Sequence, residues 1–165
     1  LFAHDPDATT AVLDATAGLG AARWAKLSPN TDRLVEVAAA AAAAGADAVT
    51  LVNTVMGMAI DVETRRPVLG AGKGGLSGPA IHPVAVRAVH DVHGALPDLP
   101  IVGVGGVATA EDAVELLLAG ASAVQVGTAT FADPRSPMSV LEGLESWCGR
   151  HGVDRVSELT GAVAT

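Results

Sequence analysis

The stretch "LPIVGVGGVATAEDAVELLLAGASAVQVGT", residues 99–128, decides the fold. Its apolar runs at 99–106 and 121–128 are typical of strands that are buried on both faces. Residues 109–120 between them have the pattern of a helix. A strand, a helix and a strand in succession predict two parallel strands joined by a right-handed crossover.

Residues that begin and end helices support this interpretation. Thr109 is a suitable N-cap, Glu111 stands at the expected capping-box position, and Gly120 follows as a stop. Near the start of the chain, Asp5 is a second N-cap and Pro6 suits a first helical position. The helices are therefore delimited by local chemistry as well as by periodicity.

The same alternation extends outward over the rest of the chain. Periodicity predicts further helices at 6–20, 32–44, 79–95 and 134–148, and further strands at 23–28 and 46–54. The segment between 54 and 79 is expected to be irregular. Strict alternation of strands and helices predicts one parallel sheet of about four strands.

Two architectures alternate in this way: an open doubly wound sheet and the (β/α)8 barrel. The strand ends favour the barrel, whose working groups lie at the carboxyl ends of successive strands. The end groups are Lys26 with Ser28, Asn53 with Thr54, Gly105 with Gly106, and Gly127 with Thr128. A complete barrel needs about 250 residues. We therefore expect residues 1–165 to form a single partial domain, the C-terminal half of a TIM barrel, with the first half upstream.

Composition excludes several classes of function. A net charge of −8 argues against nucleic acid as the main partner, because phosphate binding requires a concentrated basic surface. No apolar run approaches the roughly 18 residues of a membrane helix, so we expect no membrane association. The single cysteine, Cys148, excludes an internal disulfide and fits a reducing compartment. We interpret Cys148 as a buried, inert thiol.

The last two strand ends predict an anion site. Gly105 with Gly106, and Gly127 with Thr128, both lead towards helix N-termini. In barrels, backbone N–H groups at these positions commonly bind a phosphate. The alternative is that both pairs are ordinary tight turns, but their place at neighbouring strand ends favours the phosphate site.

The first two strand ends carry polar side chains. Lys26 lies on an apolar strand with Ser28 on the same face, and in a barrel mouth it needs an anionic partner. A lysine at the rim that reaches solvent is the alternative. Asn53 and Thr54 indicate hydrogen bonds to a polar ligand, and a simple turn cap is the alternative for Asn53.

Other polar residues give weaker signals. His90 and His93 have no evident third ligand, so we expect a solvated helix face and no metal. For His82 we favour a local loop role over that of a base. No convincing pair of catalytic carboxylates stands out.

The glycine-rich stretch "GAGKGGLSGPAIHP", residues 70–83, needs a physical reason, because glycine loses the most backbone freedom on folding. It is either a hinge or a backbone that closely approaches something. The helix that follows directly at 79 favours close approach, with Ser77 and Gly78 as the contacting residues.

Four segments together resemble class 1 dihydroorotate dehydrogenases, C-terminal half, over nearly the whole chain. They read "KLSPN", "LVNTVMGMAID", "GGLSGPAIHPVAVR" and "IVGVGGVATAEDAVELLLAGASAVQVGTATF". The form "NTVMGMAID" is most similar to the 1B type. The resemblance implies an FMN-dependent oxidoreductase that converts dihydroorotate to orotate in pyrimidine biosynthesis.

The resemblance also implies roles for particular residues. Lys26 would lie near the pyrimidine edge of the flavin and stabilise the negative charge of its reduced form. Asn53 and Thr54 would hold the substrate. The remaining cofactor contacts would come from Val52, Ser77, Gly78, Gly105, Gly106, Gly127 and Thr128.

Further expectations concern what lies outside these residues. The base of this family type is a cysteine on a mobile loop, expected upstream, and Cys148 matches no motif position. We therefore expect no catalytic base here and no activity from these 165 residues alone. The 1B resemblance implies an electron-transfer subunit with FAD and an iron–sulfur cluster, a homodimer or heterotetramer when complete, and a cytoplasmic location.

Three alternatives remain at this stage. One is a flavoenzyme like dihydropyrimidine dehydrogenase, which uses the same barrel. Another is a flavin-free phosphate-binding isomerase or lyase, for which the glycine pairs alone would suffice. The third is a non-catalytic fragment or pseudoenzyme.

Overall fold

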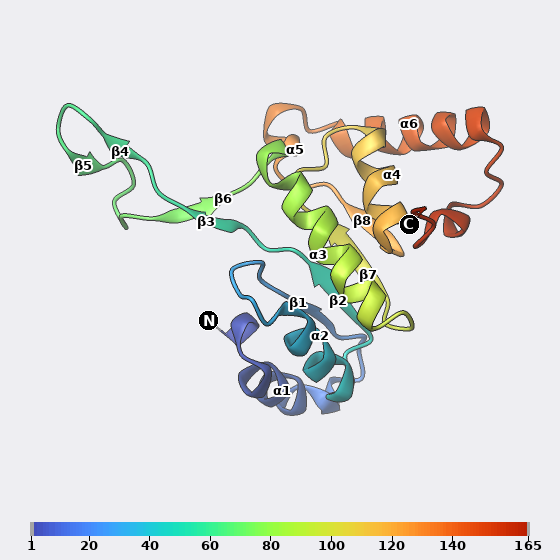
Figure 1. The fold of residues 1–165 in the computed structure, drawn as a ribbon, viewed down its shortest axis with the longest axis horizontal. Coiled ribbons are helices and arrows are strands. Elements are labelled where there is room, and N and C mark those ends of the chain that lie inside the picture. Colours follow the sequence, from blue (N-terminus) through green and yellow to red (C-terminus); the bar gives the residue numbers. More distant parts are fainter. Residues whose placement is uncertain (1, 165) are drawn as a thin grey trace.

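A computed structural model describes residues 2–164 of the chain. A four-stranded parallel sheet with strand order β1-β2-β7-β8 lies at its centre (Figure 1). The strands are β1 (Trp24–Lys26), β2 (Ala48–Leu51), β7 (Ile101–Val104) and β8 (Ala123–Gln125). Each neighbours the next of these in chain order, as consecutive strands of a barrel do.

Helices connect these strands and pack beside one another in chain order (Figure 1). The α-helices are α1 (Pro6–Ala15), α2 (Leu34–Ala43), α3 (His82–Ala95), α4 (Ala110–Ala119), α5 (Ala129–Ala132) and α6 (Ser136–His151). Short 3-10 turns are η1 (Phe2–His4), η2 (Ala17–Leu19), η3 (Pro79–Ile81) and η4 (Val156–Leu159).

The two faces of the sheet differ in burial. Register places Val49 beside Ile101 on one face, where both are fully buried in the main core with apolar side chains of the helices. Trp24 and Lys26 of β1 lie on the opposite face, and the Trp24 side chain is 55% exposed. Helices thus cover one face, which is the arrangement expected for half of a barrel.

Local signals at helix ends are confirmed with two corrections. Asp5 Oδ1 accepts a hydrogen bond from the Ala8 N–H, so Asp5 is the N-cap of α1. The capping box of α4 joins Thr109 to Asp112, not to Glu111, because the third helical residue is the one whose N–H reaches the cap. The first helix is also shorter than expected and ends at Ala15.

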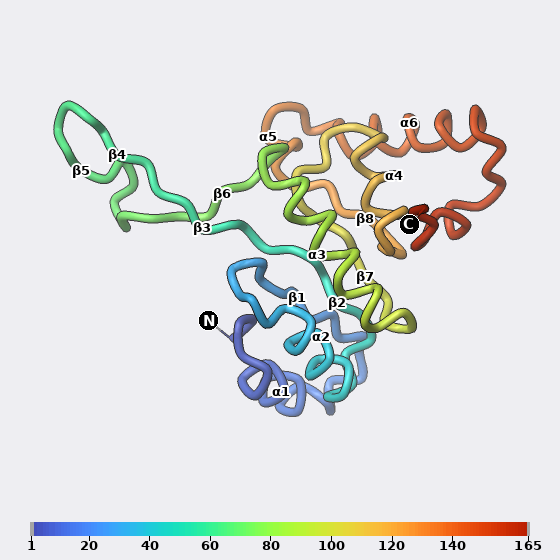
Figure 2. The backbone as a smooth tube through the Cα atoms, viewed as in Figure 1, coloured from blue at the N-terminus to red at the C-terminus, as the bar shows by residue number. Residues whose placement is uncertain are grey.

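The segment between Thr54 and Ser77 is not irregular, which corrects the expectation of strict alternation. Strand β3 (Val55–Gly57) pairs with β6 (Gly74–Leu76), and β4 (Ile60–Asp61) pairs with β5 (Arg66–Pro67), both antiparallel. Figure 2 shows these pairs as an arm that projects from the body. The stretch lacks long alternating runs, so periodicity alone gave no strand signal.

The arm explains two glycines of the glycine-rich stretch, Gly74 and Gly75. A Cβ atom on Gly75 would overlap Oγ1 of Thr54, and one on Gly74 would stand 2.7 Å from Cδ1 of Leu69. Both lie in β6, whose backbone closely approaches these side chains. A Cβ on Gly70 or Gly72 would meet nothing within 4 Å. The contact of Ser77 and Gly78 with a ligand stays a prediction.

The C-terminal region forms two helices where one was expected at 134–148. The short helix α5 precedes α6, which extends to His151 and ends at Gly152 in a left-handed conformation. Within residues 2–164, no helix is long and apolar enough to cross a membrane.

Candidate functional site

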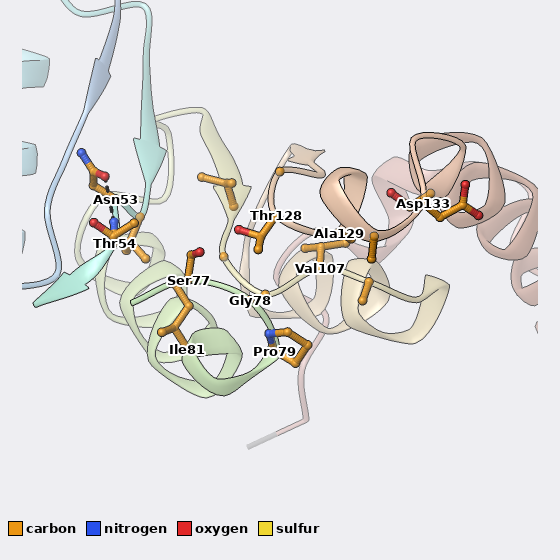
Figure 3. A pocket seen from close by; sticks show the side chains of 18 of the residues that line it. Asn53, Thr54, Ser77, Gly78, Pro79, Ile81, Val107, Thr128, Ala129 and Asp133 are labelled. Atoms are coloured by element: carbon orange, nitrogen blue, oxygen red, sulfur yellow. Dashed lines mark hydrogen bonds between the residues drawn. The ribbon is translucent and has the colours of Figure 1, made fainter. Parts of the chain in front are cut away.

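A cavity of about 560 Å³ opens at the carboxyl ends of the four parallel strands (Figure 3). It brings together every residue that the sequence predicts as a site residue. These are Lys26, Val52, Asn53, Thr54, Ser77, Gly78, Gly105, Gly106, Gly127 and Thr128. Four strand ends and the start of η3 therefore contribute to one site.

Asn53 and Thr54 follow β2 at one end of the cavity (Figure 3). The Asn53 N–H donates to the Leu27 carbonyl at 2.9 Å, which ties the segment to the end of β1. Asn53 Oδ1 accepts from the Thr54 N–H at 2.8 Å. The turn contact considered as an alternative is thus present, and it leaves the Asn53 side-chain NH2 group as a donor for a ligand.

Asn30 organises this end of the cavity and was missed from the sequence. Its Nδ2 donates to the Thr54 carbonyl and to Ser28 Oγ, each at 2.9 Å. Its Oδ1 accepts from the Met56 N–H at 2.8 Å. The only sequence signal was an asparagine shortly after a strand end, in "LSPN", which a turn would explain equally well.

Lys26 closes β1 and lines the cavity. No carboxylate within residues 2–164 forms a salt bridge with its ammonium group. The sequence predicted Ser28 on the same face as Lys26, and the structure corrects this. The strand ends at Lys26, and Ser28 turns inward to a buried position where Oγ contacts His4 Nε2 at 2.7 Å.

The Gly105–Gly106 turn follows β7 and is shaped by close packing. A Cβ on Gly105 would lie 2.7 Å from Cβ of Ala85, and a Cβ on Gly106 would lie 2.7 Å from Cβ of His82. Both glycines have positive φ angles, of 142° and 74°. Helix α3 therefore packs tightly against the turn, and only glycine fits at these two positions.

Gly127 and Gly78 present backbone to open space. A Cβ on Gly127 would meet nothing within 4 Å, and one on Gly78 would meet only Thr128 Cγ2 at 3.7 Å. Figure 3 shows Ser77 and Thr128 between the Asn53 end and the Asp133 end of the cavity. Main chain and small hydroxyls thus form the middle of the site, which leaves room for a bulky group.

The far end of the cavity contains residues that sequence reasoning missed. Asp133, Ser136 and Ser139 line it, at and beyond the start of α6. The Ser136 hydroxyl is buried and has no hydrogen-bond partner within the described part of the chain. A buried hydroxyl without a partner is unfavourable, so this atom is suited to contact a polar ligand.

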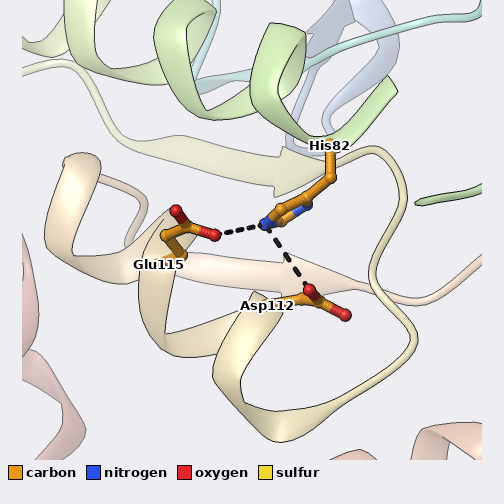
Figure 4. Close-up of side chains that lie close together, drawn as sticks. All are labelled: His82, Asp112 and Glu115. Atoms are coloured by element: carbon orange, nitrogen blue, oxygen red, sulfur yellow. Dashed lines mark hydrogen bonds and ion pairs between the residues drawn. The ribbon is translucent and has the colours of Figure 1, made fainter. Parts of the chain in front are cut away.

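His82 has more than the local loop role expected for it. Its Nδ1 lies 2.8 Å from the Gly105 carbonyl oxygen, and its Nε2 lies 3.1 Å from Glu115 Oε2 and 3.9 Å from Asp112 Oδ1 (Figure 4). This group could not be recognised in the sequence, because 30 or more positions separate His82 from the two acids. The available signal was that Asp112 and Glu115 stand three positions apart, which places them on one face of a helix.

Asp112 is held as a carboxylate by its neighbours. Burial, the largest single influence, raises its pKa, but hydrogen bonds from the Ala108 and Thr109 N–H groups oppose this. With further contributions from the Thr109 hydroxyl and His82, the net effect is a pKa below the ordinary value of 3.8.

The remaining candidate groups lie apart from the cavity. Cys148 is 8% exposed and packs with Leu117 and Leu159 in a separate apolar cluster, which agrees with an inert thiol. The His90 ring faces Asp91. The His93 ring packs against Gly120 and occupies the space that a Cβ atom at Gly120 would need. His90 and His93 are therefore not brought together as a metal pair.

Comparison with known proteins gives a consistent result. The family model described as "Dihydroorotate dehydrogenase" matches residues 2–147. The catalytic subunit of dihydroorotate dehydrogenase B (NAD(+)) from Pelobacter propionicus is 54% identical over 138 residues, covering 84% of this chain and 45% of that protein. A Solibacter usitatus protein, provisionally named dihydroorotate dehydrogenase A (fumarate), is 52% identical over the same length, again covering 84% and 45%.

A solved structure agrees with these sequence matches. The crystal structure of DHODH from Eimeria tenella in complex with ferulenol superposes with a TM-score of 0.70 at 27% identity, covering 84% of this chain and 37% of that one. The chain spans about half the length of the curated relatives that it matches. With a family model that covers most of its residues, the chain belongs to the dihydroorotate dehydrogenase family.

Proposed function

We propose that the complete protein containing these residues oxidises dihydroorotate to orotate with a bound FMN, and that the cavity holds both the FMN and the substrate. The observation that carries this proposal is that four successive strand ends and the loop before η3 bring all ten motif residues to one cavity. Family membership supplies the class of reaction.

The residues present fit FMN. The elongated flavin needs room for a flat ring, and the bare backbone at Gly127 and Gly78 provides open space. Its phosphate needs N–H donors, and the Gly106 N–H has no acceptor within residues 2–164. The unpaired, buried Ser136 hydroxyl faces the same cavity near the start of α6, where the helix dipole favours an anion.

Each residue then has a defined task. When bound, FMN supplies a two-electron acceptor for the hydride from the substrate. Lys26, whose ammonium has no carboxylate partner in the described chain, would stabilise negative charge at the ring's pyrimidine edge. Val52 lines the cavity and its N–H is fixed to the Val104 carbonyl at 2.7 Å, so its backbone would give the ring a rigid wall.

Substrate recognition falls to Asn53 and Thr54. The Asn53 amide is held in place through its Oδ1, and Thr54 is held through its carbonyl by Asn30. A preorganised donor pair of this kind orients a planar, polar pyrimidine and loses little freedom on binding. The base that removes the substrate proton is proposed to lie outside residues 1–165, because Cys148 is not part of the cavity.

An electron-transfer partner is part of the proposal. The Pelobacter propionicus relative is named a catalytic subunit that uses NAD(+). We propose a partner with FAD and an iron–sulfur cluster as the route to NAD, and a cytoplasmic homodimer or heterotetramer.

The proposal is tested with the complete protein and with residues 1–165 alone. The purified complete protein should contain about one FMN per chain and form orotate with an artificial electron acceptor, while residues 1–165 should form none. A colourless protein that fails to bind added FMN would instead favour a flavin-free phosphate-binding barrel enzyme. Orotate formation by the 165 residues at a comparable rate would refute the placement of the base.

A further inference from the structure

The His82 ring lies between the cavity's glycine turn and helix α4 (Figure 4). Nδ1 faces the carbonyl oxygen of Gly105 at 2.8 Å, and Nε2 faces Glu115 Oε2 at 3.1 Å. The His82 side chain is only 8% exposed, so water is largely kept from the ring. Both ring nitrogens are therefore fully engaged by protein atoms.

The contact at Nδ1 has only one possible direction. A carbonyl oxygen only accepts hydrogen bonds, so Nδ1 carries a proton that it donates to Gly105. The Nε2 side of the ring faces two acids, because Asp112 Oδ1 lies 3.9 Å away in addition to Glu115.

We propose that His82 is a positioning residue whose ring, held between the Gly105 carbonyl and Glu115, orients the Gly105–Gly106 peptide towards the phosphate of the bound flavin. This role rests on the proposed function. His82 itself is not a catalytic residue, because it acts through the glycine turn.

Peptide geometry transmits the effect. In a planar trans peptide, the carbonyl of Gly105 and the N–H of Gly106 point in opposite directions. Fixing the carbonyl on His82 therefore turns the Gly106 N–H away from the ring, and the peptide itself lines the cavity. A Cβ on Gly106 would lie 2.7 Å from Cβ of His82 and 2.9 Å from the Gly78 carbonyl oxygen. The turn can lie this close to His82 because residue 106 is a glycine.

The charges around the ring come from two helices. On α4, Asp112 uses Oδ2 for the Ala108 and Thr109 N–H groups and keeps Oδ1 for the ring. Glu115 is 60% exposed and shares a surface hollow with Arg87 and His90 of α3. Strand β7 and turn η3 carry no titratable side chain. Glu115 therefore holds the ring on the side opposite to Gly105.

The first arm of the test needs no flavin. In the complete protein, freed of FMN and labelled with 15N-histidine, the Nδ1 resonance of His82 should be that of a protonated nitrogen. The His82 signals are assigned by their loss in His82→Leu. An Nδ1 without a proton would overturn the inference, as would stoichiometric Zn²⁺ that depends on His82.

The second arm measures the FMN dissociation constant in Glu115→Gln, with Glu111→Gln as the matched control. Glu111 is exposed on the same helix and makes no salt bridge with His82. Because Glu115 is well exposed, its loss should weaken FMN binding about threefold. Glu111→Gln should bind FMN as the wild type does.

The outcomes of this second arm separate the two proposals. If FMN binds equally tightly to Glu115→Gln and to the wild type, the positioning role is wrong and the proposed function stands. If the complete protein binds no FMN, both fail. A threefold loss in Glu111→Gln as well would show a general effect of helix charge and would also overturn the role of His82.

Discussion

The Asn30 side chain joins the segment after β1 to the Asn53–Thr54 end of the cavity by donating to the Thr54 carbonyl at 2.9 Å. The same side chain accepts from the Met56 N–H, so it holds the main chain on both sides of Val55. Thr54 is also where Gly75 of the arm approaches most closely. Asn30 thus couples the segment after the first strand, the Asn53–Thr54 turn and the arm.

Replacing Asn30 tests this coupling. Asn30→Ala should lower the free energy of unfolding by about 2 kcal/mol, because several partly buried hydrogen bonds of roughly 0.5–1.5 kcal/mol each are lost. It should also raise the dissociation constant for orotate, while FMN content stays near that of the wild type. Titration with orotate, followed by flavin absorbance, checks this. An Asn30→Ala protein with less FMN and normal orotate affinity would show that Asn30 supports the other end of the site.

The glycines of the cavity are predicted to differ in what they tolerate. Gly127→Ala should leave stability nearly unchanged, because its Cβ meets nothing within 4 Å, yet it should reduce FMN affinity since the methyl group enters the site. Gly78→Val should reduce FMN retention and stability together, because φ is 86° at Gly78. Gly94→Ala is the control, since Gly94 is on α3 with open space around it. Full flavin content in Gly78→Val would contradict this account of the loop.

Ser136 should have opposite effects in the two ligand states. In flavin-free protein, Ser136→Ala removes a buried hydroxyl that has no partner in the described chain, and should stabilise the fold by up to about 1 kcal/mol. In the FMN complex, the same change should weaken binding. Thermal unfolding with and without FMN measures both effects, with Ser157→Ala, exposed and outside the cavity, as the control. Equal shifts in the two states would show that Ser136 makes no contact with the ligand.

Asp112 should contribute stability that depends on pH. Its pKa in the folded state is lowered from 3.8, so its contribution is fully present above that value and is lost as the pH falls through the lowered pKa. Asp112→Asn should cost about 1 kcal/mol at pH 7, where the capping box is intact in the wild type. Denaturant unfolding from pH 7 down to pH 3 should show this difference shrinking only below about pH 4. A difference that is constant throughout would contradict the assignment, and Asp98→Asn controls for the loss of one charge.

Much of the fold was predictable because barrel repeats carry strong local signals. The stretch 99–128 combines buried apolar runs, an N-cap and a glycine stop, and the structure has both strands and the helix there. Eight of the ten predicted site residues line one cavity for the same reason, since parallel strands bring their carboxyl ends to one edge. Ser77 and Gly78 line it from the loop before η3.

The features that were missed depend on contacts between distant segments. The arm has strands of two or three residues, too short for any periodicity, and its pairing is visible only when Thr54 and Gly75 lie together. His82 could not be connected to Glu115 without knowing how α3 packs on α4. Ser136 is notable only because its hydroxyl is buried without a partner, which sequence pattern does not reveal.

The central claim is that this cavity holds FMN and that the bound FMN accepts a hydride from dihydroorotate. The most direct measurement is anaerobic flavin absorbance of the complete, FMN-loaded protein after addition of dihydroorotate, with dihydrouracil as the comparison. We predict rapid bleaching by dihydroorotate and recovery with orotate, and no bleaching by dihydrouracil. Bleaching by dihydrouracil alone would instead indicate an enzyme like dihydropyrimidine dehydrogenase, and no bleaching by either compound would contradict the proposed function.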